Sequence, residues 1–174
     1  MSDILVISAT RLTKIGFERR SLLASSLRRM SFDPRIKASI SYKNRRGLPA
    51  VFNSRIVEEN RGKILAFTHD DVRFDDYWLS ARLDEGLRAY DVIGVAGCRR
   101  RYPNQASWAF TTLGMWDIAE SLSGAVAHFP GPREAMSYYG QAKRRCKLLD
   151  GLLIAVRAST LIACGLPLRR TVPL

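Results

Sequence analysis

Short apolar runs alternate along the chain with segments whose apolar residues recur at helical spacing. The runs are rich in β-branched residues and are bounded by glycine or polar residues, which is typical of buried strands. Strands are predicted at residues 4–7, 36–42, 64–67, 91–97 and 148–156, and helices at 18–30, 49–59, 75–89 and 158–164. The strand at 36–42 alternates apolar and polar residues, which favours an edge position or one wetter face.

This order of elements predicts an α/β fold with a mainly parallel sheet, right-handed crossovers and flanking helices. The length of 174 residues fits one domain over the whole chain. Residues 98–147 are loop-rich, and short antiparallel strands are predicted in them at 123–129 and 135–139. This β-insert is interpreted either as a binding flap or as a small ordered insert packed on its own aromatic residues.

The candidate chemistry lies directly after the strand at 64–67, where His69, Asp70 and Asp71 follow Thr68. In open α/β sheets, ligands gather at the carboxyl ends of the strands. Two carboxylates there would repel a phosphate unless a hard divalent cation lay between them, and oxygen ligands suit magnesium and manganese. The alternative is a helix N-cap or a solvated turn. Asp150, beside Gly151, is similarly open to a role as a site carboxylate or as a turn residue.

The charge balance, 28 basic against 16 acidic residues, indicates anionic partners: nucleic acid, acidic lipid or phosphorylated substrates. The basic residues form small scattered clusters, most of which are interpreted as solvated surface, and no nucleic-acid-binding motif is present. The chain has no GxxxxGK[ST] loop, which excludes a P-loop NTPase. Ser8, Ala9 and Thr10 after the first strand offer no nucleophilic aspartate of the haloacid-hydrolase type.

The compartment predicted from the sequence is the cytoplasm. No apolar run approaches the length of a membrane span, and the first ten residues lack a basic leader. The three cysteines have no metal-like spacing, and so few of them fit a reducing compartment better than a disulfide framework.

Five segments, taken together and in order, resemble the bacterial glycosyltransferase-like proteins related to family 2. They are ILVISATR from Ile4, NRRGLPAVFN from Asn44, ILAFTHDDV from Ile64, YDVIGVAG from Tyr90 and LLDGLLIAVR from Leu148. The resemblance implies the A-type, Rossmann-like nucleotide-diphospho-sugar transferase fold (GT-A). It also implies an inverting, metal-dependent transfer of a sugar from a nucleotide-diphosphate donor to a saccharide, lipid or protein acceptor.

The resemblance also implies roles for individual residues, with HDD as the counterpart of the metal-binding DXD motif. Asp71 would ligate Mn²⁺ or Mg²⁺ directly, and Asp70 would lie by the ribose or a metal-bound water. Thr10 and Asn44 would line the nucleotide pocket, and Arg46 and Asn53 would lie beside the base. Asp150 is the one carboxylate left near a late strand end, and is therefore the candidate catalytic base.

Related chains continue past the position of Gly165 with an FHFYDxDF-like segment that supplies acidic residues to the acceptor side. Here LPLRRTVPL, residues 166–174, stands in that place. The expectation is a donor-binding half, either an active transferase or a catalytically impaired remnant, and a homo-oligomer that covers elements left exposed. The alternative function is a basic interaction module that binds nucleic acid or anionic lipid through its net charge of +12.

Overall fold

A computed structural model describes residues 2–128 and 135–166, and the chain divides into two compact units. The first unit contains residues 1–93 and 155–174, and the second contains residues 94–154. Phe129, the last residue of the strand predicted at 123–129, and the tail from residue 167 onward lie outside the described residues. The prediction of one domain over the whole chain stays a prediction.

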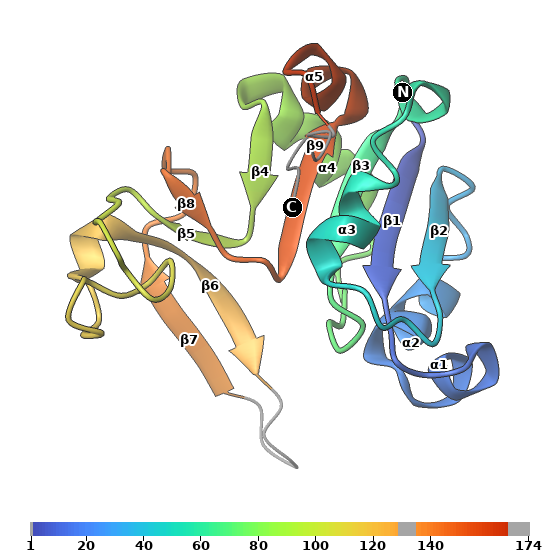
Figure 1. Cartoon of the computed structure of the whole chain (residues 1–174), viewed down its shortest axis with the longest axis horizontal. Coiled ribbons are helices and arrows are strands. Elements are labelled where there is room, and N and C mark those ends of the chain that lie inside the picture. The colour runs from blue at the N-terminus through green and yellow to red at the C-terminus, as the bar shows by residue number, and fades with distance from the viewer. Residues whose placement is uncertain (1, 129–134, 167–174) are drawn as a thin grey trace, which may run out of the picture. The chain divides into compact units, whose positions relative to one another are not determined.

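The first unit is built on a mixed sheet with the strand order β2-β1-β3-β9-β4 (Figure 1). β1 pairs in parallel with both neighbours, so that Ile4 lies opposite Ile36 of β2 and Ile64 of β3. The strands are β1 (Ile4–Ala9), β2 (Ile36–Ser41), β3 (Ile64–Thr68), β4 (Val92–Gly94) and β9 (Leu153–Arg157). The predicted α/β class is confirmed, and β2 lies at the edge of the sheet as its alternating pattern indicated.

Short helices connect these strands. They are α1 (Lys14–Arg20), α2 (Leu22–Arg29), α3 (Leu48–Asn53), the 3₁₀ helix η1 (Glu58–Asn60), α4 (Leu79–Ala89) and α5 (Ala158–Ala163). β1 leads through α1 and α2 to β2, and β2 leads through α3 back across β1 to β3. β3 leads through α4 to β4 at the other edge of the sheet. The connections that leave β1 and β3 therefore run toward opposite edges, which makes the gap between these two strands a topological switch point.

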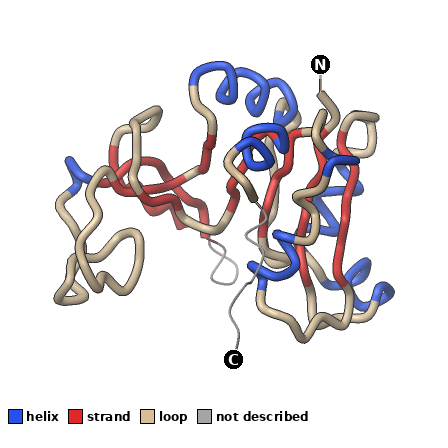
Figure 2. The backbone as a smooth tube through the Cα atoms, turned by 45° about the horizontal axis from the view of Figure 1, so that its top comes forward, coloured by secondary structure: helices blue, strands red, loops and turns tan. Residues whose placement is uncertain are grey.

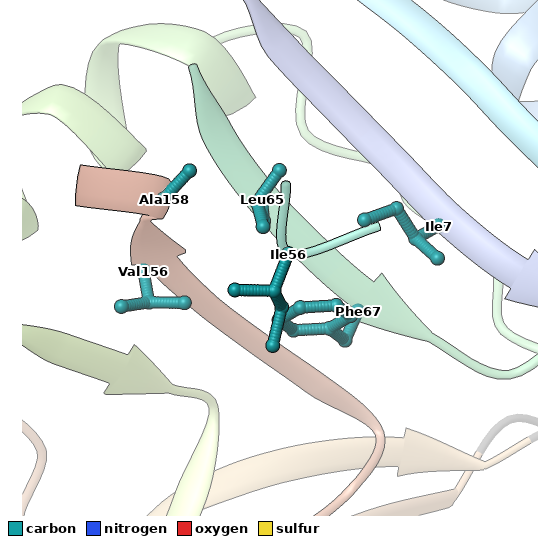
Figure 3. Close-up of a cluster of buried hydrophobic side chains, with 6 residues drawn as sticks. All are labelled: Ile7, Ile56, Leu65, Phe67, Val156 and Ala158. Atoms are coloured by element: carbon teal, nitrogen blue, oxygen red, sulfur yellow. The ribbon is translucent and has the colours of Figure 1, made fainter. Parts of the chain in front are cut away.

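The core of this unit forms around β3, whose five residues are all buried. Leu65 and Phe67 of β3 belong to one buried cluster with Ile7 of β1, Ile56, Val156 and Ala158 (Figure 3). The ring of Phe67 also lies against that of Phe52 from α3, with 4.9 Å between ring centroids. A strand buried on both faces needs apolar residues at successive positions, which is the run that predicted it.

Two predicted helices are each interrupted in the structure. The helix predicted at 18–30 is two helices, because the Ser21 side chain accepts the N–H of Ala24 and starts α2 as its N-cap. α1 begins earlier, where Thr13 Oγ1 accepts the N–H of Gly16. The helix predicted at 49–59 ends at Asn53, and η1 follows after a break in which Asn60 Nδ2 donates to the carbonyl of Arg55.

Two predicted strands are also divided, and one helix starts late. Residues 91–97 form β4 and then β5 (Ala96–Cys98), which belong to different sheets. Residues 148–156 form β8 (Leu148–Leu149) and β9, separated by a turn. The helix predicted at 75–89 starts at Leu79 as α4, and Trp78, just before it, is 72% exposed.

The second unit is a four-stranded sheet of order β7-β6-β5-β8. β5 pairs antiparallel with β6 (Leu122–His128) and with β8, and β6 pairs antiparallel with β7 (Ala135–Gly140). The prediction of antiparallel strands in the insert is confirmed. The long loop between β5 and β6 (tan in Figure 2) carries the 3₁₀ helix η2 (Ala119–Ser121) at its end. Its aromatic rings contact β7, with 4.9 Å between the centroids of Trp108 and Tyr139.

Two buried serines of the first unit allow a matched test of how much a buried side-chain hydrogen bond contributes to stability. Ser26 Oγ accepts the N–H of Phe74 at 2.8 Å and donates to Leu22 at 3.1 Å. Ser8 Oγ is equally buried but has no hydrogen-bond partner among the described residues. Ser26→Ala leaves a buried N–H unpaired and is expected to lower the free energy of unfolding by about 1–3 kcal/mol.

Ser8→Ala removes an unpaired hydroxyl from the same core and is expected to leave stability unchanged or slightly increased. Urea unfolding of both variants, followed by circular dichroism, measures the difference. Equal losses in the two variants would contradict this assignment of the hydrogen bonds.

Candidate functional site

The candidate site lies where three parallel strands end side by side. β2, β1 and β3 are adjacent and run in the same direction, so their carboxyl ends share one edge of the sheet. Backbone hydrogen bonds tie the segments after β1 and β2 together. Asn44 donates to the carbonyl of Thr10 at 2.8 Å, and Lys43 donates to Leu12 at 2.9 Å. Two loops that would otherwise move separately are thereby held as one wall.

A hollow of about 970 Å³ opens at this edge, lined by residues 9–12, 43–46, 48, 69 and 70. We call it the strand-end hollow. All of its lining residues belong to the first unit. A volume of this size falls in the range of small-molecule and cofactor sites. Its position is the one at which open α/β sheets bind ligands, the carboxyl edge at a switch point.

Three predicted nucleotide-site residues line the strand-end hollow: Thr10, Asn44 and Arg46. Thr10 is buried, and its Oγ1 accepts the N–H of Leu12 at 3.1 Å. The Asn44 amide donates to the carbonyl of Arg46 at 2.7 Å and accepts its N–H at 3.2 Å, so this side chain shapes the loop. The guanidinium of Arg46 donates to the carbonyl of Ala50 at 3.3 Å, which leaves its other N–H groups for a ligand.

The two acidic residues after β3 occupy different places. Asp70 lines the strand-end hollow and is half-buried, whereas Asp71 is exposed and is not part of the lining. The turn is anchored by α2, because the carbonyl of Asp70 accepts the Ser21 hydroxyl at 2.6 Å and the N–H of Leu23 at 3.4 Å. The structure therefore brings Asp70, rather than the Asp71 that the sequence favoured, to the hollow.

The remaining predicted residues lie apart from the lining. Asn53 is the last residue of α3 and is half-buried. Asp150 lies in the turn between β8 and β9, where its Oδ1 accepts the N–H of Leu152 at 2.7 Å. This bond supports the interpretation of Asp150 as a turn residue. Because Asp150 belongs to the second unit, its role as a catalytic base stays a prediction.

A metal ion at this site would depend on its ligand for much of its coordination. Among the described residues, no three side chains of His, Cys, Asp or Glu lie close enough together to hold a metal ion by themselves. Asp70 supplies carboxylate oxygens, which suit Mg²⁺ or Mn²⁺, and such ions commonly take one or two carboxylates together with phosphate oxygens and water. The residues present thus fit a cation that binds with a phosphorylated ligand.

Sequence reasoning missed three cations in the lining, Arg11, Lys43 and Arg45. Arg11 was not singled out, and Arg45 was grouped with basic clusters interpreted as solvated surface. The signal that could have found them is position, because each lies within four residues after the end of a predicted strand. Basic residues in the first turns after parallel strands face the edge at which ligands bind.

The cysteines lie outside this site. Cys98 is buried in the core of the second unit with Leu122 and Ala109. Burial raises the pKa of its thiol, and the nearby Asp117 carboxylate acts in the same direction. A thiol held protonated is a poor nucleophile, so Cys98 contributes packing rather than reactivity.

No protein-family model matches the chain, and no curated protein sequence matches it. None of the helices in the described part of the chain is long and apolar enough to cross a membrane.

Proposed function

We propose that the chain binds a nucleotide-diphosphate sugar in the strand-end hollow and is a glycosyltransferase-like protein of the GT-A type. The observation that supports this most directly is the convergence of Thr10, Asn44, Arg46 and Asp70 at one hollow. These residues come from three segments far apart in the sequence, and each was expected at the donor site. The parallel strands β1, β2 and β3 end at this edge, so the segments that follow them lie side by side at the hollow.

The chemistry assigned to each group follows from its place. Thr10 and Asn44 shape the wall for the nucleotide, and Arg46 presents N–H groups to its base or phosphates. Asp70 would hold Mn²⁺ or Mg²⁺ against the diphosphate, with Asp71 at the outer side of the same turn. When bound, the cation would offset the charge that develops on the leaving diphosphate. An acceptor hydroxyl would displace the nucleoside diphosphate with inversion and give its proton to a carboxylate base.

Calorimetry with UDP, GDP and inorganic pyrophosphate, each with Mn²⁺ and with EDTA, tests this proposal. We expect UDP or GDP to bind at least about tenfold more tightly than pyrophosphate in Mn²⁺, because the nucleoside adds contacts. Asp70→Asn should weaken binding in Mn²⁺ about tenfold, since a charged ligand to the cation is lost. In EDTA the same substitution should leave pyrophosphate binding unchanged or stronger, because it removes a charge that repels phosphate.

Two further variants complete the experiment. Asp71→Asn should have a smaller effect than Asp70→Asn, because Asp71 is exposed outside the lining. Asp3→Asn, before the amino end of β1, removes the same charge at the opposite end of the strand and should change nothing. Equal affinity for nucleotide and pyrophosphate would contradict a nucleotide donor. Indiscriminate binding of DNA or anionic vesicles at the hollow would favour the interaction-module alternative.

A further inference from the structure

The lining of the strand-end hollow carries an excess of positive charge. Arg11, Lys43, Arg45 and Arg46 face it together with a single carboxylate, that of Asp70. Within the part of the chain that the structure describes, the side chains of Arg11, Lys43 and Arg45 make no hydrogen bond or ion pair. Other arginines of this unit are engaged, as in the pair of Arg35 with Asp84 at 2.7 Å. Three cations without a partner among the described residues therefore line one hollow.

Like charges held around one concave surface repel each other, and field lines focus in a concave site. An anion in the hollow removes this repulsion and gains charge-assisted hydrogen bonds from the guanidinium groups, which match the geometry of phosphate oxygens. A diphosphate carries enough acceptor oxygens to engage several of these cations together. The lining thus fits a diphosphate better than a neutral or singly charged ligand.

The loops that carry these cations are held in place before any ligand arrives. Lys43 has a φ of +47°, a left-handed conformation that is uncommon for a residue with a side chain. Its N–H donates to the carbonyl of Leu12, and the next residue, Asn44, is bonded to Thr10. These bonds fix Arg11 and Arg45 on neighbouring loops, so little ordering of the backbone is needed when an anion binds.

We propose that Arg11, Lys43, Arg45 and Arg46 bind the diphosphate directly, so that the diphosphate group of the donor binds without a divalent cation. This inference rests on the proposed function in taking the strand-end hollow as the donor site. In this arrangement the metal ion is not required for donor binding, since the four basic side chains already neutralise most of the phosphate charge. The cation would then act on the leaving group rather than decide whether the donor binds.

Titration of the full chain in EDTA with inorganic pyrophosphate, UDP and GDP tests the inference. We expect all three to bind in EDTA, with affinities that fall steeply as salt rises, because the contacts are ionic. Arg11→Gln and Arg45→Gln should each weaken binding about tenfold, the loss of one charge-assisted contact. The matched control is Lys37→Gln, which removes an exposed cation near the amino end of β2 and should change affinity less than about twofold.

The outcomes separate this inference from the proposed function. Binding of UDP or GDP only when Mn²⁺ is present would overturn the inference and leave the function standing. Binding of pyrophosphate in EDTA as tightly as the nucleotides would support the inference and overturn the nucleotide donor. Equal losses in Lys37→Gln and the hollow variants would show diffuse charge attraction and overturn the inference. Absence of binding under every condition would overturn both.

Discussion

Gly124→Ala is expected to unfold the second unit, with a loss of at least about 4 kcal/mol in its free energy of unfolding. Gly124 lies in β6 with a φ of +97°, in the left-handed region that side chains avoid. A Cβ there would stand 2.0 Å from the carbonyl oxygen of Val95 and 2.9 Å from Cα of Ala96. Both atoms belong to backbone at the pairing of β5 with β6, so the two strands would have to separate.

Gly114→Ala provides the control, because it separates backbone strain from the contact. Gly114 has a φ of +72°, but a Cβ there meets nothing within 4 Å. Its substitution should therefore cost only the conformational strain, about 1–2 kcal/mol. Hydrogen exchange measured by mass spectrometry should show lost protection of β5, β6 and β7 in Gly124→Ala, with β1 and β3 still protected. Similar exchange in the two variants would contradict the close approach of the strands.

The strands of the first unit could be predicted because their pattern and their environment agree. The residues of β3 are successive apolar side chains, and burial on both faces asks for that composition. The alternating residues of β2 match its edge position, where one face is less covered. The resemblance implied site roles for Thr10, Asn44 and Asp70, and these residues meet at one edge because each follows one of three parallel strands.

The interruptions could not be predicted from periodicity, because they depend on single hydrogen bonds. Ser21 continues a helical spacing, yet its hydroxyl caps α2 and also donates to the carbonyl of Asp70. For Asp150 the sequence left a turn open as one of two interpretations, and its carboxylate accepts the N–H of Leu152 in such a turn. Such local bonds compete with regular structure, and which one forms is decided by tertiary contacts.

The choice between Asp70 and Asp71 was likewise beyond the sequence. Adjacent residues after a strand point in different directions, and the direction of each depends on how the turn is anchored. Here Ser21 and Leu23 of α2 hold the carbonyl of Asp70, which sets the turn so that Asp70 lines the hollow. The anchor lies 49 residues away in sequence, so no local pattern records it.

Phe67→Ala is expected to lower the free energy of unfolding of the first unit by about 3–5 kcal/mol. Phe67 is 6% exposed and packs with Leu65, Ile56 and the ring of Phe52, so its removal leaves a cavity at the centre of the core. It also lies in β3 two residues before His69 and three before Asp70. We therefore expect pyrophosphate binding to weaken even under conditions where the variant remains folded, because the cavity loosens the strand that positions the turn.

Phe32→Ala is the matched control, since Phe32 is 59% exposed and its ring touches only the exposed ring of Tyr77 among the described aromatic pairs. It should lose less than about 1 kcal/mol and bind pyrophosphate like the unaltered chain. Urea unfolding by circular dichroism and titration with pyrophosphate measure both effects. A stable Phe67→Ala variant would contradict the core assigned around β3. A destabilised variant with unchanged binding at low temperature would show that the hollow is held by its own loop hydrogen bonds, independently of the packing beneath it.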